Sequence, residues 1–409
     1  MKNPTRSDII LRTSYIVSIV VALLVILGIV QVVRPVAPPT VSASVPASTQ
    51  IAGTGPALPW PQGVQADVGI PGVGIWPQHG PSQAEPIGSL AKMMTAYLVL
   101  KAHPLSQFQN GPTLTVTPAD VQLLQQDASS HQSVLPVAAG EKISERTLLE
   151  GLLVPSGNNA ATMLAQWVGG SVAKFTAEMN AEAKTLGLNN THFNGPVGLS
   201  AATVSTAADQ LKLASIIMEN PVVRQIVAMP QLTTDGQLVY NYNYLIGHQG
   251  ITGVKTGSTT QSGGCVVLST DKTVGGHTLT IYASVLGQPA TSPQGQVWAA
   301  LDAANALLKA TDKVVGEHTV VTQGEVFGHI DAGWQSPVPL VAAKSAALLG
   351  WPGMSYTLHL TTHVPQGNTM AAGTVVGALT VHAGSQTVTV PVKTAESLKA
   401  PTYAYRLKR

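Results

Sequence analysis

A run of 19 residues without a charged side chain, at positions 15–33, constrains the fold of this chain more than any other feature of its sequence. As a helix, the run would be roughly 28 Å long, enough to cross the hydrocarbon core of a membrane. Lys2, Arg6 and Arg12 precede it, and basic residues on that side place the N-terminus in the cytoplasm. We therefore expect a cytoplasmic tail at 1–14 and a single-pass transmembrane helix at 15–33. The rest of the chain would then lie outside the membrane.

A cleaved signal peptide is the second interpretation of the same run, and it would make the protein secreted. The apolar part would be unusually long for a signal peptide, and the Val-Ser-Ala pattern at 41–43 is distant from it. A retained membrane anchor is therefore favoured. Positions 34–63 follow, with seven prolines among Ala, Ser, Thr and Val. This composition predicts a semi-rigid, extended linker.

The overall composition excludes several classes of protein. Charged residues make up 10% of the chain and the net charge is +2, so no basic stripe is present that would bind nucleic acid. A hydrophobic content of 44% argues against bulk disorder. The single cysteine, Cys265, excludes an intramolecular disulfide and a multi-cysteine metal site. We expect a buried thiol there, no cofactor and no nucleic-acid partner.

The stretch 86–100, Pro-Ile-Gly-Ser-Leu-Ala-Lys-Met-Met-Thr-Ala-Tyr-Leu-Val-Leu, contains the first candidate for catalysis. Its good helix formers follow the breakers Pro86 and Gly88, which predicts a helix beginning near Ser89. Ser89 and Lys92 would share one face of the first turn. A buried lysine with a lowered pKa can take the proton of a serine nucleophile. The same spacing recurs at Ser171–Lys174 and Ser269–Lys272, so it needs partners elsewhere in the chain.

Two later segments can supply those partners. Pro-Ser-Gly-Asn-Asn at 155–159 separates two apolar helical patterns, so Ser156 and Asn158 are expected on a tight inter-helix loop. The alternative there is an ordinary turn and helix cap. The run Tyr-Asn-Tyr-Asn-Tyr-Leu at 240–245 leads towards Lys-Thr-Gly at 255–257, which we interpret as a strand at the edge of a cleft.

The Lys-Thr-Gly segment is suited to binding an anionic group. Lys255 and Thr256 offer a cation and a hydroxyl, and Gly257 lets a substrate backbone approach closely. The alternative is an exposed lysine before a turn.

Shorter patterns describe the rest of the chain. In 64–312 we expect strands at 113–117, 264–270 and 279–286, and helices at 144–154, 160–168, 171–187, 206–218 and 296–309. Residues 313–400 carry β patterns punctuated by Gly and Pro, which predict a small all-β domain. His359 and His363 are separated by about 13 Å if they lie on a strand, too far for both to bind one zinc ion. We therefore predict no metal site.

Ser-x-x-Lys, Ser-x-Asn and Lys-Thr-Gly in this order are typical of penicillin-binding proteins and class A β-lactamases. The chain resembles the serine-type D-alanyl-D-alanine carboxypeptidases, the low-molecular-weight penicillin-binding proteins, from about residue 64 to 310. The resemblance implies an α/β fold in which helices cover an antiparallel sheet, forming a catalytic domain at 64–312. It also implies that the enzyme removes the terminal D-alanine from peptidoglycan stem peptides, with β-lactams as covalent inhibitors.

The resemblance implies a role for each residue of the three segments. Ser89 is the nucleophile, Lys92 its base, and Ser156 the relay of a proton to the leaving D-alanine. The substrate-binding residues are Asn158, Lys255, Thr256, Gly257 and Ser258, with backbone N–H groups of Ser89 and Ser258 forming the oxyanion hole.

The sequence departs from the family pattern at three places. Asn159 stands where aspartate is common, Ser258 replaces a commoner aromatic residue or histidine, and no arginine occurs between Lys255 and Lys313. These departures concern substrate preference and rate. Two alternative functions on the same scaffold are a serine β-lactamase and a catalytically idle wall-binding protein. Class A β-lactamases use a glutamate after Ser-x-Asn to activate water, but residues 188–196 contain no carboxylate.

Overall fold

The computed structural model describes residues 6–76, 79–363 and 367–408. Lys2 and the start of the expected cytoplasmic tail therefore lie outside the described residues. The chain forms two compact units. One comprises residues 53–317 with 349–352, and the other comprises 1–52, 318–348 and 353–409. We call them the catalytic unit and the β-rich unit.

A five-stranded antiparallel sheet is the centre of the catalytic unit. Its order is β11 (Ile251–Thr259), β12 (Gly263–Val274), β13 (His277–Gln288), β3 (Gln65–Ile70) and β4 (Gly74–Ile75). The strands expected at 264–270 and 279–286 are confirmed within β12 and β13, which form a hairpin in which Val274 pairs with His277 across Gly275 and Gly276. Both glycines have the positive φ that such a turn requires. The Lys-Thr-Gly segment forms a strand, as predicted, and this strand, β11, lies at the edge of the sheet.

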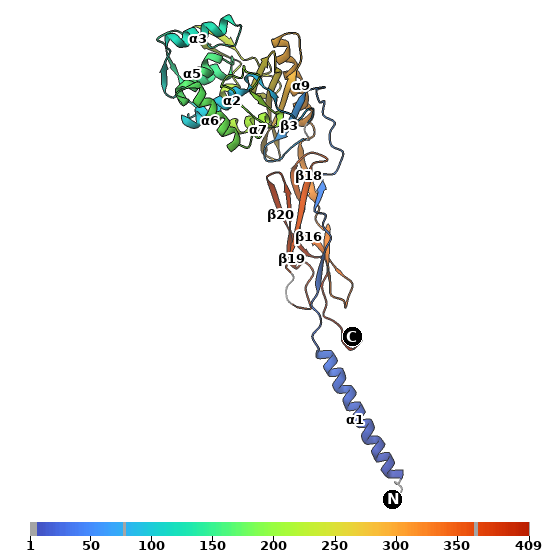
Figure 1. The fold of residues 1–409 in the computed structure, drawn as a ribbon. Helices are drawn as coiled ribbons and strands as arrows, with labels where there is room; N and C mark the ends of the chain where they lie inside the picture. The colour runs from blue at the N-terminus through green and yellow to red at the C-terminus, as the bar shows by residue number, and fades with distance from the viewer. Residues whose placement is uncertain (1–5, 77–78, 364–366, 409) are drawn as a thin grey trace. The chain divides into compact units, whose positions relative to one another are not determined.

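Helices cover both faces of this sheet, which confirms the predicted α/β fold (Figure 1). On one side α9 packs against β11, β12 and β13, and on the other α7 packs against β3 and β13. Because the sheet is covered on both sides, the run Cys-Val-Val-Leu of β12 is buried without alternation. The Cys265 thiol is fully buried, as expected. The helices are α2 (Lys92–Ala102), α3 (Pro118–Ser129), α4 (Glu145–Leu153), α5 (Asn158–Gly169), α6 (Val172–Thr185), α7 (Ala207–Ile217), α8 (Pro221–Val227) and α9 (Pro293–Asp312).

The first helical segment differs from the prediction at its start. Residues Gly88–Ala91 form a 3-10 turn, η1, and the α-helix begins only at Lys92. No side chain caps the turn, and Gly88 has a φ of 54° that ordinary helix geometry excludes. By contrast, Ser144 caps α4 by accepting a hydrogen bond from the backbone N–H of Thr147, as its sequence predicted.

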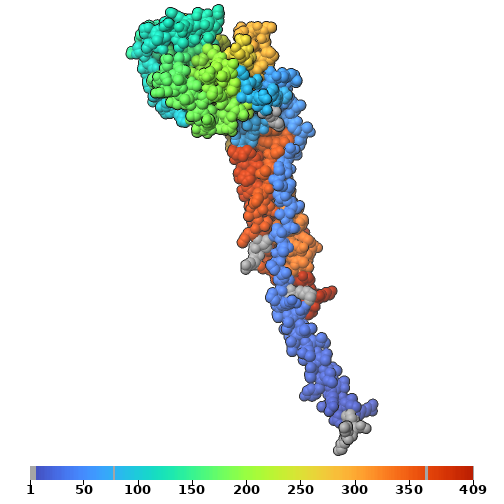
Figure 2. All heavy atoms as spheres, viewed as in Figure 1, coloured from blue at the N-terminus to red at the C-terminus, as the bar shows by residue number. Residues whose placement is uncertain are grey.

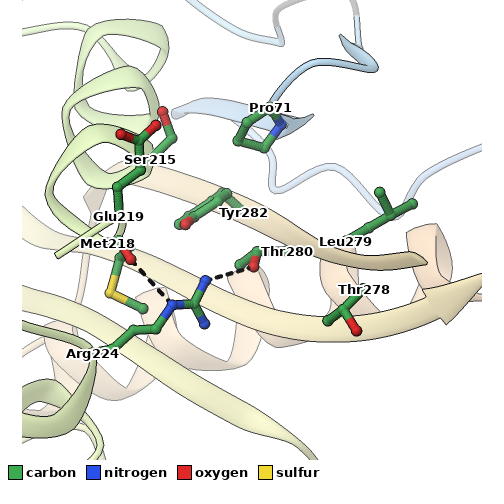
Figure 3. Close-up of a pocket in the computed structure, with 9 residues that line it drawn as sticks. All are labelled: Pro71, Ser215, Met218, Glu219, Arg224, Thr278, Leu279, Thr280 and Tyr282. Carbon is green, nitrogen blue, oxygen red and sulfur yellow. Dashed lines mark hydrogen bonds between the residues drawn. The ribbon is translucent and has the colours of Figure 1, made fainter. Parts of the chain in front are cut away.

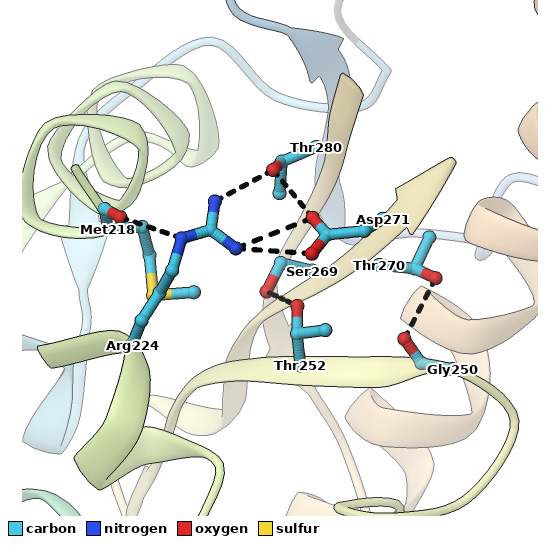
Figure 4. Close-up of polar contacts among 8 residues, drawn as sticks. All are labelled: Met218, Arg224, Gly250, Thr252, Ser269, Thr270, Asp271 and Thr280. Carbon is cyan, nitrogen blue, oxygen red and sulfur yellow. Dashed lines mark hydrogen bonds and ion pairs between the residues drawn. The ribbon is translucent and has the colours of Figure 1, made fainter. Parts of the chain in front are cut away.

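Three two-stranded pairs complete the catalytic unit. They are β5 (Glu85–Pro86) with β8 (Val204–Ser205), β6 (Thr113–Thr115) with β7 (Lys142–Ser144), and β9 (Gln231–Thr234) with β10 (Gln237–Tyr240). Arg224 of α8 connects the helices to the sheet (Figure 4). Its guanidinium donates to the carbonyl of Met218, to Thr280 at 2.9 Å, and to the carboxylate of Asp271 at 3.2 Å.

The β-rich unit confirms the strands expected in the C-terminal region. A seven-stranded sheet has the order β1 (Thr40–Ala43), β15 (Val326–Asp331), β16 (Val338–Ala342), β20 (Gln386–Thr394), β19 (Val375–Ala383), β18 (Ser355–Thr362) and β2 (Ser48–Gln50). A further pair joins β14 (Gly316–Val321) to β17 (Ala346–Gly350).

Part of the expected linker at 34–63 is built into that sheet. β1 pairs with β15 and β2 pairs with β18, so both sheet edges are covered by N-terminal chain. Figure 2 shows this segment lying along the orange and red strands of the same unit. Extended Ser-, Thr- and Val-containing stretches between prolines can pair with an exposed edge, which removes unpaired backbone groups from it.

The N-terminal apolar run forms the helix α1, Arg6–Val33. It is longer than the 15–33 expected, because the preceding residues, which include Ile9, Ile10 and Leu11, are also helical and Asp8 lies in the favourable first turn. It is the one helix in the described part of the chain that is long and apolar enough to cross a membrane. The short helix α10, Tyr403–Lys408, contacts it, with Arg406 donating to the carbonyl of Val32 at 2.8 Å.

Candidate active site

Ser89 and Lys92 meet at the junction of the 3-10 turn and α2. Nζ of Lys92 lies 2.9 Å from Oγ of Ser89, within hydrogen-bond distance. The Lys92 side chain is fully buried, whereas Ser89 is partly exposed. The hydroxyl is therefore accessible from solvent while the amine behind it is not.

Ser156, on the loop between α4 and α5, and Asn158, which was expected on that loop but is the first residue of α5, complete the surroundings of the Lys92 amine. Nζ lies 2.7 Å from Oδ1 of Asn158 and 3.5 Å from Oγ of Ser156. Both residues are buried, and they come from a segment more than sixty positions further along the chain. The first two predicted segments thus meet at one atom, Nζ of Lys92, which is within hydrogen-bond distance of side chains from both.

Burial lowers the pKa of Lys92 well below its ordinary value, and the positive charge of Lys255 lowers it further. The carboxylate of Asp127, at the end of α3, acts in the opposite direction. A neutral amine beside a serine hydroxyl can accept the serine proton. The electrostatics therefore favour Lys92 as a base.

The loop that carries Ser156 is held in an unusual conformation. Ser156 has a φ of 60°, in the left-handed region that a non-glycine residue seldom adopts. On one side, Asn158 donates from Nδ2 to Oε1 of Gln132 at 2.7 Å. On the other, Asn159 accepts from the backbone N–H of Leu135 and donates to its carbonyl, at 2.9 and 2.8 Å. These contacts fix both asparagines.

Asn159 shows why an amide is used at this position of the chain. It is fully buried and pairs with one N–H and one carbonyl of Leu135, which requires a donor and an acceptor on the same side chain. An aspartate in its ionised form has no donor for that carbonyl. The departure from the family pattern at Asn159 is thus matched by its surroundings.

Lys255 and Thr256 occupy the edge strand β11 on the other side of the site. Both are buried, and Nζ of Lys255 donates to the carbonyl oxygen of Thr256 at 2.8 Å. Burial lowers the pKa of Lys255 to about 7. The lysine is therefore not an exposed residue before a turn, which was the alternative interpretation of this segment.

Gly257 and Gly88 let two backbone segments approach closely. A Cβ on Gly257 would lie 2.7 Å from the backbone nitrogen of Ser89, and one on Gly88 would lie 3.2 Å from that of Ser258. Any side chain at Gly257 would therefore displace the turn that carries Ser89. The backbone nitrogens of Ser89 and Ser258 both lie at this approach, where the predicted oxyanion hole is expected. The Ser258 hydroxyl donates to Oε1 of Gln296 on α9 at 2.5 Å.

One cavity of about 1000 Å³ unites these segments. The predicted site residues that line it are Ser89, Ser156, Asn158, Thr256, Gly257 and Ser258. The two site lysines are buried beside it. Sequence reasoning missed Gln132, which also lines the cavity, and Asp127. Both are distant in sequence from the three segments, and no local pattern distinguishes them.

The other Ser-x-x-Lys copies have structural roles. Ser171 caps α6 by accepting from the backbone N–H of Lys174, and Ser269 is buried in β12 against the hydroxyl of Thr252 (Figure 4). A second cavity, of about 410 Å³, lies between α7, α8 and β13 (Figure 3). None of the predicted site residues line it. Within the described residues, no cluster of three or more His, Cys, Asp or Glu side chains could hold a metal ion.

Comparison with known proteins identifies the family of this chain. The peptidase S11 family model, described as D-alanyl-D-alanine carboxypeptidase, matches residues 75–289, more than half of the chain. The D-alanyl-D-alanine carboxypeptidase of Streptomyces sp. strain K15 is 33% identical over 217 residues, covering 48% of this chain and 72% of the relative. The D-alanyl-D-alanine endopeptidase of Escherichia coli K12 is 33% identical over 207 residues, covering 48% of this chain and 62% of that protein.

Solved structures show the same fold. Penicillin-binding protein 5 from Haemophilus influenzae superposes with a TM-score of 0.60 at 21% identity, over 85% of this chain and all of that one. The Streptomyces K15 DD-transpeptidase gives a TM-score of 0.53 at 27% identity, over 63% of this chain and 98% of that one. The chain therefore belongs to the peptidase S11 family, the serine-type D-alanyl-D-alanine carboxypeptidases of the low-molecular-weight penicillin-binding protein class.

Proposed function

We propose that this chain is a membrane-anchored serine D-alanyl-D-alanine carboxypeptidase that removes the terminal D-alanine from peptidoglycan stem peptides. One observation carries the proposal. The fully buried Lys92 amine lies 2.9 Å from Ser89 Oγ, in a cavity whose far wall is formed around Lys255 and Thr256. A nucleophile with its base and a cation for the substrate carboxylate are the parts that cleavage at a peptide C-terminus needs.

In the proposed acylation, Ser89 Oγ attacks the carbonyl carbon of the penultimate D-alanine and its proton passes to Nζ of Lys92. The negative charge formed on the carbonyl oxygen is stabilised by the backbone N–H groups of Ser89 and Ser258. The C–N bond then breaks, and Ser156 passes the proton from Lys92 to the departing amine of D-alanine. Lys255 and Thr256 bind the terminal carboxylate, and Asn158 positions the peptide.

Deacylation follows the same proton path in reverse. Water attacks the Ser89 ester, Lys92 accepts a proton from that water, and the proton returns to Ser89 Oγ as the ester bond breaks. A β-lactam would acylate Ser89 in the same way, because its ring amide and carboxylate imitate the D-Ala-D-Ala terminus. The bulky adduct would then be cleared slowly.

The lining of the cavity bears on the β-lactamase alternative. Among the described residues that line it, none is an aspartate or glutamate, so no carboxylate lies there to activate a deacylating water. Rapid turnover of nitrocefin would contradict the carboxypeptidase proposal and favour a β-lactamase. An idle wall-binding protein would neither acylate nor release D-alanine.

Endopeptidase activity is a second candidate, supported by the name of the Escherichia coli relative. The same acyl-enzyme would form, but the leaving group would be the amine of a neighbouring stem rather than free D-alanine. Incubation of the full chain in detergent with a D-Ala-D-Ala pentapeptide and, separately, with a cross-linked dimer distinguishes the two. We expect D-alanine from the pentapeptide and none from the Ser89→Ala variant. Equal release by this variant would contradict the proposed nucleophile.

Membrane anchoring is proposed from α1, with the N-terminus in the cytoplasm and the chain beyond residue 33 outside. Its described side chains are exposed rather than packed into a protein core. Protease added to intact spheroplasts is expected to remove the catalytic unit. N-terminal sequencing that finds a mature start after residue 40 would establish a cleaved signal and a secreted protein instead.

A further inference from the structure

Three tyrosines project from the segment that leads to β11, and the mechanism uses none of them. In the run Tyr-Asn-Tyr-Asn-Tyr at 240–244, the asparagines point into the protein and the tyrosines out. Asn241 donates to the carbonyl of Met229 at 3.0 Å and accepts from the backbone N–H of Asn243 at 2.9 Å. Asn243 is buried and accepts from the backbone N–H of Leu245 at 3.1 Å. Because tyrosines alternate with these anchored asparagines, the three tyrosine side chains face the solvent.

A tryptophan of α9 extends this aromatic surface. Trp298 packs edge-on against Tyr244, with ring centroids 6.3 Å apart. We call the four exposed residues Tyr240, Tyr242, Tyr244 and Trp298 the aromatic rim, because all four line the catalytic cavity. Their exposed fractions lie between 45% and 63%. Large rings held open to solvent beside a catalytic cavity are a typical sign of a binding surface.

The aromatic rim connects the two walls of that cavity. On one wall, the hydroxyl of Ser133 donates to that of Tyr242 at 3.2 Å, and the carbonyl of Ser133 accepts from the backbone N–H of Asn158. On the other, the Tyr244 hydroxyl donates to Asp302 of α9, the helix whose Gln296 contacts Ser258. The rings are thus held on the elements that position the candidate catalytic residues, so a substrate bound to them is held in register with Ser89.

The chemistry of the lining restricts what the aromatic rim can bind. The described lining residues include no Asp, Glu, Lys or Arg. Besides the polar groups of the rings themselves, they offer the hydroxyls and amides of Ser, Thr, Asn and Gln and the imidazole of His131. The buried Lys255, beside Thr256, is assigned to the substrate carboxylate, and no carboxylate, ammonium or guanidinium group belongs to the described lining residues themselves. Flat aromatic faces with neutral donors and acceptors suit a neutral ring that has C–H groups on one face and hydroxyls or amides at its edge. A pyranose sugar with an N-acetyl group has this character.

We propose that the aromatic rim binds the N-acetylated sugar rings of the glycan strand that carries the stem peptide. This inference rests on the proposed function, since it concerns the remote part of the same substrate. The rim is continuous with the catalytic cavity, and a short stem at roughly 3.5 Å per extended residue joins the scissile bond to its sugar. Binding energy gained at the sugar can then contribute to turnover at Ser89.

The first test measures sugar binding without catalysis. The full-length Ser89→Ala variant in detergent is titrated calorimetrically with penta-N-acetylchitopentaose, an uncharged chain of N-acetylated sugars. We expect saturable binding that weakens by about five- to tenfold when Trp298→Ala is added. Phe108→Ala is the matched control, because Phe108 is also exposed but lies outside the cavity lining. Absence of binding, or equal binding by the Trp298→Ala and control proteins, would overturn the proposal.

The second test compares a disaccharide-pentapeptide with the same pentapeptide free of sugar. The wild-type protein should have the higher kcat/KM for the sugar-bearing substrate, and Trp298→Ala should lower kcat/KM for that substrate several-fold more than for the free peptide, so that the preference is lost. Equal losses on both substrates would show that the rim binds peptide, which contradicts the inference. Failure of the wild-type protein to release D-alanine from either substrate would contradict the proposed function, and the titration would still decide the role of the rim.

Discussion

The start of α2 and the start of α6 carry the same four-residue pattern in two different environments. At Ser89–Lys92 the lysine amine is fully buried and reaches the serine oxygen. At Ser171–Lys174 the lysine is exposed, and the serine oxygen accepts from its backbone N–H instead. The spacing is the same, but one serine faces a base and the other caps a helix.

The difference comes from long-range packing. Lys92 is enclosed by a loop that brings Asn158 and Ser156 to its amine, and the charge of Lys255 adds to the effect of burial on its pKa. No such groups enclose Lys174. A catalytic interpretation of Ser-x-x-Lys therefore depends on residues far away in the sequence.

The largest expected effect comes from replacing the two lysines in parallel. Lys92→Met keeps much of the side-chain volume but removes the base, so D-alanine release should fall by roughly 10²–10⁴-fold. Lys174→Met should leave the rate unchanged, because that side chain is exposed and distant from the predicted chemistry. Initial rates of D-alanine release measure both. Similar losses in the two variants would remove the distinction between the two copies.

The second prediction concerns pH. Lys255 must be protonated to bind a carboxylate, and burial lowers its pKa to about 7. The free enzyme therefore loses this charge as the pH rises through about 7, and kcat/KM should fall by up to about tenfold per pH unit above it. Lys92, whose pKa is also lowered, must be neutral to act as a base, so its protonation lowers the rate on the acid side.

A matched variant assigns the alkaline limb of that profile. Lys255→Arg retains a positive charge throughout the range, so its kcat/KM should be lower overall but should no longer fall near neutral pH. If kcat/KM of this variant still fell above about pH 7, the titration would belong to a group other than Lys255.

The third prediction tests how the start of α5, which carries Asn158 and Asn159, is fixed in place. Asn159→Asp removes the donor to the carbonyl of Leu135 and places a carboxylate in a fully buried position. We expect the catalytic unit to lose about 1–3 kcal/mol of unfolding free energy. Calorimetric melting of the full chain measures this loss. Asn189→Asp, at an exposed position, is the control and should have little effect.

The smallest expected effect comes from replacing the two serines of the same pattern. Ser171→Ala removes the cap of α6 and should lower stability by about 0.5–2 kcal/mol, with no change in the rate of D-alanine release. Ser89→Ala should do the reverse, because Ser89 makes no cap and its hydroxyl is partly exposed. Thermal melting and rate measurements on the same two preparations provide both readings.

Much of the fold could be predicted because its signals are local. Apolar patterns predicted the strands at 264–270 and 279–286 and the helix at 144–154, and the structure has β12, β13 and α4 at these places. The three motif segments identified the residues that the structure gathers around one cavity. Their chemical roles remain predictions.

What the sequence did not show is produced by distant contacts. β1 and β2 are short and contain small polar residues, and they become strands only because they pair with β15 and β18, about three hundred residues further along the chain. Gln132 carries no local sign of a function, yet it fixes Asn158. The 3-10 turn at Ser89 likewise reflects the close approach of Gly257 to its backbone nitrogen, which no helix propensity predicts.

The most direct test of the account is the mass of the intact protein after incubation with benzylpenicillin. We expect one covalent adduct on the wild-type protein and on Ser171→Ala, persisting for minutes, with peptide mapping to Ser89. The Ser89→Ala variant should remain unmodified. An adduct that persists on Ser89→Ala, or one that maps to Ser171 or Ser269, would contradict the claim that the buried Lys92 amine makes Ser89 the nucleophile of this chain.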